Sequence, residues 1–369
     1  MAVDPHCAPP GGGPHVADDY CESEGSDPGR LELPDGQQEM VRRLRAAMDP
    51  AAPLVGLLVH GGSFAFGAGV LEALDAVVDA WQPGIGGAAA IARALFGDVS
   101  PAGRTPQTWY ATDTELPAAG TMSLYPSSSA ASSAASASAS SSASSSSASP
   151  PSPPSPPPPS KGLTYRHYTG APTFAFGHGL SYTTFAYSAL TTNASSLTTT
   201  ASSLTTNASS SAAATASSAP SPAPSSASSS AAATTARVPA CATVGVEVAV
   251  ANTGGVASDE VVQLYVETPD ATVPAPRLRL AAFARVHVAA GATTTVRLAV
   301  GAAARAVMSA KGAAATGDAI YTEAADEQVI EPGRLVIHVG GGQPGFGAAT
   351  LNTTVAIEGG ARLVDCEAR

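Results

Sequence analysis

Carboxylate side chains crowd a short polar segment near the start of the chain. Between Cys21 and Arg30 lie Glu22, Glu24 and Asp27. A protonated carboxyl group can give its proton to a reacting oxygen, and a second, ionised carboxylate can attack the reacting centre. The acid keeps its proton near neutral pH only if burial or a neighbouring negative charge raises its pKa. The same composition is also typical of a solvated acidic loop, so the residues alone leave both interpretations open.

Two histidines stand beside glycines. His60 precedes a glycine pair at the end of an apolar run and could line a cleft, whereas His178 lies between two glycines and is expected to be structural. The glycine-rich run at 83–87 lacks the Lys-Ser/Thr of a phosphate loop. No serine lies in a G-x-S-x-G elbow, so an esterase has no support.

The cysteines form no C-x-x-C pair, so neither a zinc site nor any other metal or cofactor is expected. Their spacing leaves the disulfide pairing open. The four are Cys7, Cys21, Cys241 and Cys366.

Charge and hydropathy exclude several partners. The 18 basic and 29 acidic residues give a net charge of −11 without a basic stripe, so nucleic acid is not an expected partner. No apolar run approaches the ~20 residues of a membrane helix. The first ten residues lack the apolar core of a signal peptide, so the leader of a secreted protein would lie on sequence outside this chain.

Alternating strand and helix patterns follow the acidic segment and predict an α/β layer with a parallel sheet. Asp35 and Gln38 form a capping box ahead of the first helix. The expected elements are a helix at 36–48, a strand at 54–59, a short helix at 71–76, a strand at 76–81 and a helix at 88–96.

Two tracts of Ser, Ala, Thr and Pro interrupt this pattern, at about 126–160 and 189–236. They offer too little apolar surface to offset the entropy of ordering, so we expect disordered linkers.

A period of two begins at Thr243, where Val244, Val246, Val248 and Val250 alternate with smaller or polar residues. The spacing of strands and turns predicts a β-sandwich of roughly 100 residues. The run from Ser181 to Phe185 is a further predicted strand. The other strands are expected at 261–266, 278–288, 294–300 and 334–339.

These stretches resemble glycoside hydrolase family 3 over residues 20–110, 161–188 and 242–340. Tyr165 to Gly170, followed by Phe176-Gly-His-Gly-Leu-Ser-Tyr-Thr-Thr-Phe185, resembles the signature that precedes the family's fibronectin type III-like domain. The run from Trp81 to Tyr110 resembles the family's α/β-sandwich domain.

The resemblance implies a partial α/β sandwich followed by a fibronectin-III-like β-sandwich, with long disordered insertions. The expected divisions are a disordered start at 1–20, the partial α/β domain at 21–122, a Ser/Ala/Pro insertion at 123–160, the end of the α/β domain and the junction at 161–188, a Ser/Thr/Ala linker at 189–236, the fibronectin-III-like domain at 237–358 and a tail at 359–369.

The acidic segment resembles the acid/base loop of the family's β-xylosidase and α-L-arabinofuranosidase-like branch. On this resemblance Glu24 takes the acid/base position and Glu22 is the second candidate. The pair Pro28-Gly29, inserted between Asp27 and Arg30, departs from the family's pattern.

The activity implied for the parent enzyme is retaining hydrolysis of terminal xylosyl or arabinosyl residues, in xylan or arabinan catabolism. Retaining enzymes place two carboxyls ~5–5.5 Å apart. The family's nucleophile is an Asp on a barrel of ~250 residues, which cannot fit before Glu24. The chain alone is therefore expected to be inactive.

The expected partners are an oligosaccharide or cell-wall polysaccharide and a barrel domain on other sequence, in an extracellular or cell-wall location. The alternative is a non-catalytic carbohydrate-binding or scaffolding protein.

Overall fold

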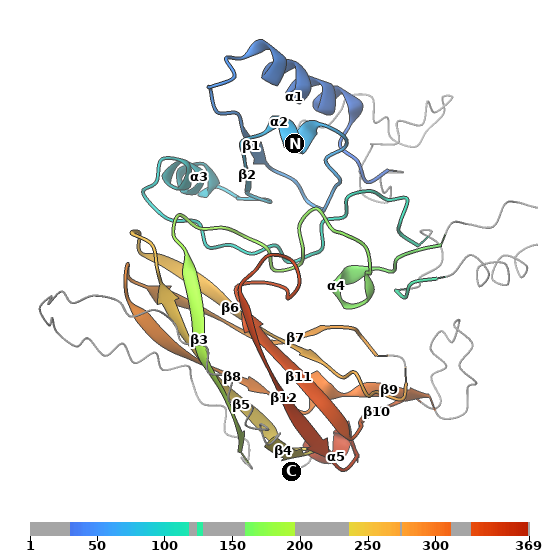
Figure 1. The fold of residues 1–369 in the computed structure, drawn as a ribbon. Helices are drawn as coiled ribbons and strands as arrows, with labels where there is room; N and C mark the ends of the chain where they lie inside the picture. Colours follow the sequence, from blue (N-terminus) through green and yellow to red (C-terminus); the bar gives the residue numbers. More distant parts are fainter. Residues whose placement is uncertain are drawn as a thin grey trace, which may run out of the picture.

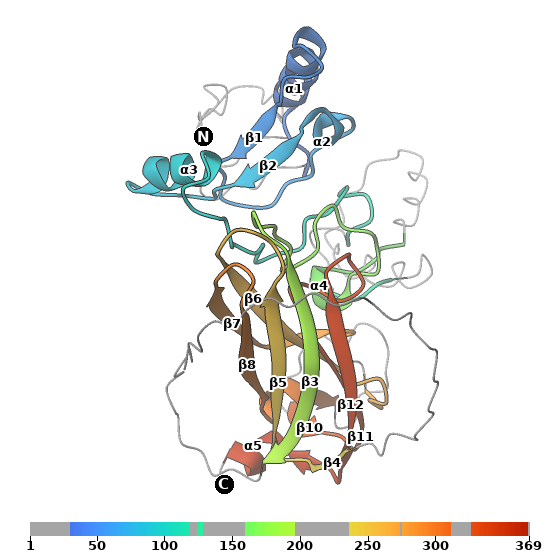
Figure 2. The same cartoon turned by 60° about the vertical axis from the view of Figure 1, so that its left-hand side comes forward.

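The computed structural model describes residues 30–117, 124–127, 159–195, 236–273, 275–310 and 326–367. Its described part has two regions, with helices and a small parallel sheet at one end and a β-sandwich at the other (Figure 1). A turned view shows the same division, with the sandwich strands running away from the helical end (Figure 2). The predicted fold class is therefore confirmed.

The helical end follows the predicted alternation of strand and helix. Val55 pairs with Ala76 in a parallel register that continues to the pair of Leu58 and Asp79. The elements are α1 (Asp35–Ala47), β1 (Val55–Leu58), α2 (Val70–Ala73), β2 (Ala76–Asp79), α3 (Gly87–Leu95) and, after the first tract, α4 (Thr164–His167).

The start of α1 differs from the predicted capping box. Pro34 is the N-cap and Asp35 is the first helical residue, with no capping hydrogen bond from a side chain. A capping side chain acts from non-helical backbone just outside the helix, and Asp35 is already inside it. Gln38 is buried, and its Nε2 donates to the Leu33 carbonyl at 2.6 Å. The capping box is therefore wrong, although the helix itself is confirmed.

A five-stranded sheet and a three-stranded sheet form the sandwich, in the orders β4-β12-β11-β6-β7 and β3-β5-β8, and a small sheet β13-β10-β9 closes one end. The strands are β3 (Phe185–Ser195), β4 (Ala236–Pro239), β5 (Thr243–Asn252), β6 (Ser258–Glu267), β7 (Arg279–Val288), β8 (Thr293–Val300), β9 (Val307–Ala310), β10 (Asp326–Ile330), β11 (Gly333–Gly340), β12 (Thr350–Glu358) and β13 (Ala361–Arg362).

The alternating valines of β5 build the core as predicted. Every second residue of that strand is buried, and the inward valines pack against residues of the facing sheet such as Leu264 and Ile337. Burial of each such side chain contributes roughly 1.5–3 kcal/mol relative to exposure.

The first strand of the sandwich lies partly in sequence expected to be a linker. β3 begins at Phe185 rather than at Ser181, and it runs to Ser195 with antiparallel pairing to β5. The register shifts between Ser188 and Thr191, where Ala189 has a φ of 52°. The expected linker start at 189 and the strand start at 181 are therefore wrong, because pairing with β5 orders a segment of low intrinsic preference.

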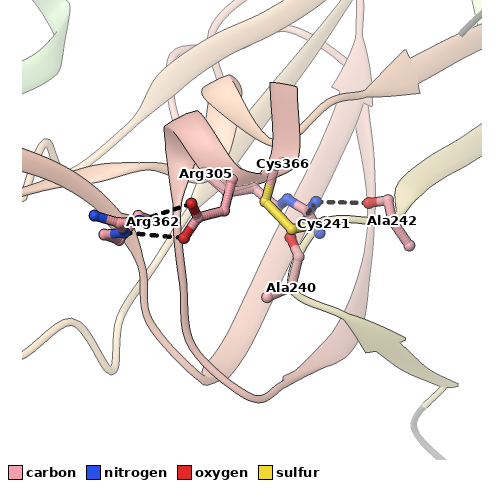
Figure 3. Close-up of a disulfide and its surroundings, with 7 residues drawn as sticks. Ala240, Cys241, Ala242, Arg305, Arg362 and Cys366 are labelled. Atoms are coloured by element: carbon pink, nitrogen blue, oxygen red, sulfur yellow. Dashed lines mark hydrogen bonds and ion pairs between the residues drawn. A yellow bond between two sulfur atoms is a disulfide. The ribbon is translucent and has the colours of Figure 1, made fainter. Parts of the chain in front are cut away.

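The end of the chain is also more ordered than the expected tail at 359–369. Residues 361–362 form β13 against β10, and α5 (Leu363–Glu367) follows. A disulfide joins Cys366 of α5 to Cys241 between β4 and β5 (Figure 3). The sandwich therefore extends past the expected boundary at 358. Cys7 and Cys21 lie outside the described residues.

The two ends of the first tract lie side by side. The backbone N–H of Ser127 donates to the Ser160 carbonyl at 3.0 Å, and the two hydroxyls are 3.2 Å apart. Lys161 continues the contact, because its N–H donates to the Glu115 carbonyl at 2.7 Å. A short loop can therefore replace the intervening residues.

We expect that excising residues 128–158, with two glycines joining Ser127 to Pro159, leaves the melting temperature unchanged or raises it by a few degrees, because the shorter loop costs less entropy to close. The cost of loop closure varies by only about 0.6 kcal/mol for each doubling of length. Differential scanning calorimetry of both proteins measures this. A fall of more than about 5 °C would show that the excised residues pack on a domain.

Candidate functional site

The predicted acid/base loop meets the described structure at the carboxyl edge of the parallel sheet. Glu22, Glu24 and Asp27 lie outside the described residues, which begin at Arg30. The Leu33 N–H donates to the Ala65 carbonyl and the Ala65 N–H to the Leu31 carbonyl, both at 2.8 Å. The C-terminal end of the acidic segment is therefore anchored beside the segment that follows β1.

His60 is the first residue of interest at this edge. It follows β1, while Asp79 ends the neighbouring strand, and His60 Nε2 lies 2.9 Å from Asp79 Oδ1. The Nδ1 atom lies 2.6 Å from the Gly62 carbonyl oxygen, and the residue is 7% exposed. Both ring nitrogens thus have protein partners, so His60 orients the loop after β1 instead of lining a cleft as we expected.

Aromatic rings surround His60. Trp81, Phe64 and Trp109 have ring centroids 4.9 to 5.3 Å from the imidazole. Phe66 and Phe174 extend the cluster, with centroids 5.8 and 6.1 Å from Trp109. The aromatic cluster is thus a core against which Leu33 packs, and it ties residues on both sides of the first tract together. Sequence reasoning did not find it, although five of its members are large rings in a chain with 5% aromatic residues.

The chemistry available to the described residues at this edge is limited. Open α/β sheets bind ligands outside the carboxyl ends of their strands. Among the residues described, no three His, Cys, Asp or Glu side chains gather as a metal ion would need. His60 and Asp79 are engaged with each other. Among the described residues, this edge therefore offers structural support and no cluster of metal-binding side chains.

One face of this small sheet is open within the described structure. Val55, Leu57 and Val59 are each more than 40% exposed, and Ile85 and Phe96 are exposed nearby in sequence to β2 and α3. Parallel sheets are normally covered on both faces. The exposed face is therefore the kind of surface that further protein covers.

The signature stretch around His178 joins the two regions. The His178 ring stacks on Phe174 with centroids 5.0 Å apart, and the backbone N–H of His178 donates to Thr105 Oγ1 at 3.1 Å. Burial, followed by the charge of Arg104, lowers the pKa of His178. Gly177 has a φ of 75°, and a Cβ there would lie 2.0 Å from Gln263 Oε1. The stretch is structural, as its flanking glycines indicated.

A buried ion pair crosses the same junction. Arg104 Nη2 donates to both carboxylate oxygens of Glu260 on β6 at 3.0 Å, and Arg104 Nε donates to the Gly341 carbonyl at 3.2 Å. Tyr187 on β3 donates its hydroxyl to Glu260 at 2.9 Å. The side chains of Arg104 and Glu260 are only 10% and 3% exposed. This pair fixes the sandwich against the loop that continues into the α/β region.

The fold defines a class: an α/β region that is buttressed by a fibronectin-III-like sandwich. Residues 14–182 match the glycosyl hydrolase family 3 C-terminal domain, and residues 260–343 match the fibronectin type III-like domain. The chain belongs to glycoside hydrolase family 3.

Curated relatives are xylosidases and glucosidases. The chain is 27% identical to a xylan 1,4-β-xylosidase of Xylanibacter ruminicola over 74% of this chain and 22% of that protein. It is 31% identical to β-D-xylosidase 1 of Arabidopsis thaliana over 46% of this chain and 18% of that protein. It is 28% identical to a β-glucosidase of Rhizobium radiobacter over 75% of this chain and 26% of that protein. The chain thus spans about a quarter or less of these relatives.

Solved structures share the fold. The β-glucosidase of Bifidobacterium adolescentis aligns with a TM-score of 0.57 and 21% identity, covering 90% of this chain and 37% of that one. The β-glucosidase of Listeria innocua bound to glucose aligns with a TM-score of 0.55 and 19% identity, covering 92% of this chain and 35% of that one. In the described part of the chain, no helix is long and apolar enough to span a membrane.

Proposed function

We propose that this chain supplies the acid/base loop and its support to a retaining β-xylosidase-like glycosidase. Glu24 donates the proton to the leaving oxygen, and Glu22 is the second candidate for that role. The substrates are oligosaccharides or cell-wall polysaccharides with terminal xylosyl or arabinosyl residues, in an extracellular or cell-wall setting.

The observation that carries this proposal is the anchoring of Leu31 and Leu33 on Ala65. It holds the residues that follow the acidic segment at the carboxyl edge of a sheet, where Leu33 packs against the aromatic cluster. Leu31 is seven positions after Glu24, so Glu24 can lie at most about 25 Å from this anchor. A sugar bound at that edge is within reach of a carboxyl group on the loop.

A second carboxylate must come from elsewhere. Two carboxyls ~5–5.5 Å apart are needed for retention. The exposed face of β1, with Val55 and Leu57, offers a surface on which further protein could pack. We propose that a barrel domain carries the nucleophile and completes the site.

The 369-residue chain by itself is expected to release no nitrophenol from nitrophenyl β-xyloside above background. General acid catalysis alone contributes only ~10²–10⁴-fold, far below the acceleration that glycosidases reach. Turnover of this substrate by the purified chain alone would show that its own residues include a nucleophile.

The acid/base assignment is tested in the same chain joined to a family 3 barrel. Glu24→Gln is expected to lower hydrolysis of unactivated xylobiose by ~10²–10⁴-fold while sparing kcat/KM for nitrophenyl xyloside, whose leaving group needs no proton. The kcat for nitrophenyl xyloside should still fall, because the same residue is the general base of the second step. Glu22→Gln is the matched control and should retain activity. The opposite pattern would move the role to Glu22. If neither variant loses activity and the unjoined chain binds xylo-oligosaccharides saturably, a non-catalytic binding role is favoured.

A further inference from the structure

Strand β12 contains the triplet Asn352-Thr353-Thr354, which is an acceptor sequence for N-linked sugar. Two other triplets of this kind begin at Asn193 and Asn207, within the second Ser/Thr-rich tract, where composition alone produces them readily. Asn207 lies outside the described residues. The triplet on β12 lies outside both tracts and in a regular strand, so its place in the fold decides whether it can carry a sugar.

Asn352 is the outermost member of a row of residues that crosses the five-stranded sheet. The register pairs Tyr265 of β6 with His338 of β11, and His338 with Asn352 of β12. Tyr265 is 1% exposed and contacts Tyr165 of the junction, the His338 side chain is 16% exposed, and Asn352 is exposed. Alternate residues of a strand face the same side, so Thr354 lies on this outer face too. The row therefore leaves the cover of the junction at Asn352, where a bulky group has room.

The first half of β12 is also an edge of the sheet. β11 pairs with β12 from residue 350 to residue 357, whereas β4 pairs only with residues 355–358. Among the described strands, residues 350–354 therefore have a neighbour on one side only. Such an edge can pair with a strand of another molecule, and proteins protect their edges against this. Asn352 lies in the middle of the unprotected stretch.

The disulfide indicates the compartment in which this chain folds. Cys241 and Cys366 are joined in the sandwich that carries Asn352. Disulfides form and persist along the secretory route and are rare in the cytosol. N-linked sugar is added along the same route, on exposed positions of secreted proteins. This argument is independent of the proposed glycosidase activity.

We propose that Asn352 carries an N-linked oligosaccharide, which covers the one-sided stretch of β12. The donor is an oligosaccharide attached to a polyprenyl diphosphate. The amide nitrogen of Asn352 forms a bond to the anomeric carbon of the first sugar, and the bond from that carbon to the diphosphate oxygen breaks. The lipid diphosphate leaves with the electron pair of the broken bond, and the amide nitrogen gives up one proton. The transfer needs no oxidant or reductant.

The first test secretes the full chain from cultured animal cells behind an added leader. Peptide-N-glycosidase in heavy-oxygen water converts each sugar-bearing asparagine to a labelled aspartate, and mass spectrometry of the peptides reads each acceptor separately. The Asn352 peptide should carry the label in most molecules. Thr354→Val keeps Asn352 but destroys the acceptor and should lose the label, whereas Thr354→Ser keeps the acceptor and should retain it. An unlabelled Asn352 in the folded, secreted chain would overturn the proposal.

The second test measures the effect of the sugar on the strand edge. Asn352→Gln removes the acceptor but keeps an amide side chain, and light scattering of the concentrated protein should show several-fold more self-association than in Thr354→Ser, the matched control. Circular dichroism checks that both variants are folded. Equal scattering from the two would overturn the protective role at the edge. Neither test uses glycosidase activity, so both outcomes are separate from the fate of the proposed function.

Discussion

Replacing Arg104 with methionine is expected to lower the free energy of unfolding by about 3–5 kcal/mol, because Glu260 is then left as a buried, uncompensated charge. The guanidinium gives Glu260 two hydrogen bonds at a side-chain exposure of 3%. The Tyr187 hydroxyl alone cannot replace that charge. Equilibrium unfolding in urea measures the change. We also expect the two regions to unfold in separate steps, since the pair links them.

A double replacement separates the cost of the orphaned charge from the value of the pair. Arg104→Met with Glu260→Leu should recover most of the lost stability, because apolar residues of similar volume often replace buried ion pairs without loss. Arg297→Met breaks an exposed pair with Glu247 and should cost no more than about 1 kcal/mol. Equal losses from Arg104→Met and Arg297→Met would contradict the buried-pair account.

The loss of unfolding free energy caused by Arg104→Met should become smaller as the pH falls. Burial raises the pKa of Glu260, and Arg104 opposes that rise. Without Arg104 the folded-state pKa lies still higher above its unfolded value, so the folded protein binds the proton more tightly. This contribution to stability is fully present below the unfolded pKa and is lost as pH rises through the folded pKa. The difference in unfolding free energy between the unaltered protein and the Arg104→Met variant should accordingly be larger at pH 7 than near pH 4.5.

Removal of the Cys241–Cys366 disulfide is the other change with a large expected effect. The bond closes a loop across a sequence separation of 125 residues. The chain-entropy relation gives about 4–5 kcal/mol for a loop of that length. Urea unfolding of Cys241→Ser should therefore show a free energy of unfolding that is lower by about 4–5 kcal/mol.

The pairing itself provides the control for this experiment. Cys366→Ser and the double variant Cys241→Ser/Cys366→Ser should each lose as much as Cys241→Ser alone, because the effects of two partners in one bond are not additive. A double variant with twice the loss would mean that the cysteines act through packing instead of through the bond.

The regular elements were predictable where pattern and burial agree. The valines of β5 alternate in sequence and are buried in the same alternation. The short apolar runs of β1 and β2 were predicted as parallel strands and pair that way. The predicted strand at 181–185 ended where β3 begins, because most of the residues that follow Phe185 are Ser, Thr, Ala and Asn, and only pairing with β5 makes them a strand.

The junction and the disulfide depend on contacts between distant residues that local patterns do not encode. Glu260 lies an even number of residues before Val262 and Leu264, so it points to the same inward face of β6. This alternation in the sequence could have indicated a buried carboxylate. Its partner Arg104 lies 156 residues earlier, so sequence alone did not identify it. The candidate acid residues Glu22 and Glu24 were proposed only through resemblance, and they lie outside the described residues.

The placement of β3 makes the sandwich a composite of two stretches of chain. A single backbone cut anywhere between residues 196 and 235 would leave β3 on the first fragment and its partner β5 on the second. The fragments would still share the β3–β5 hydrogen bonds, the inward residues of β3 and the Arg104–Glu260 pair. The protein would then behave as a non-covalent heterodimer held by a donated strand, and proteolysis within that interval would be visible on a denaturing gel while the native particle kept its size.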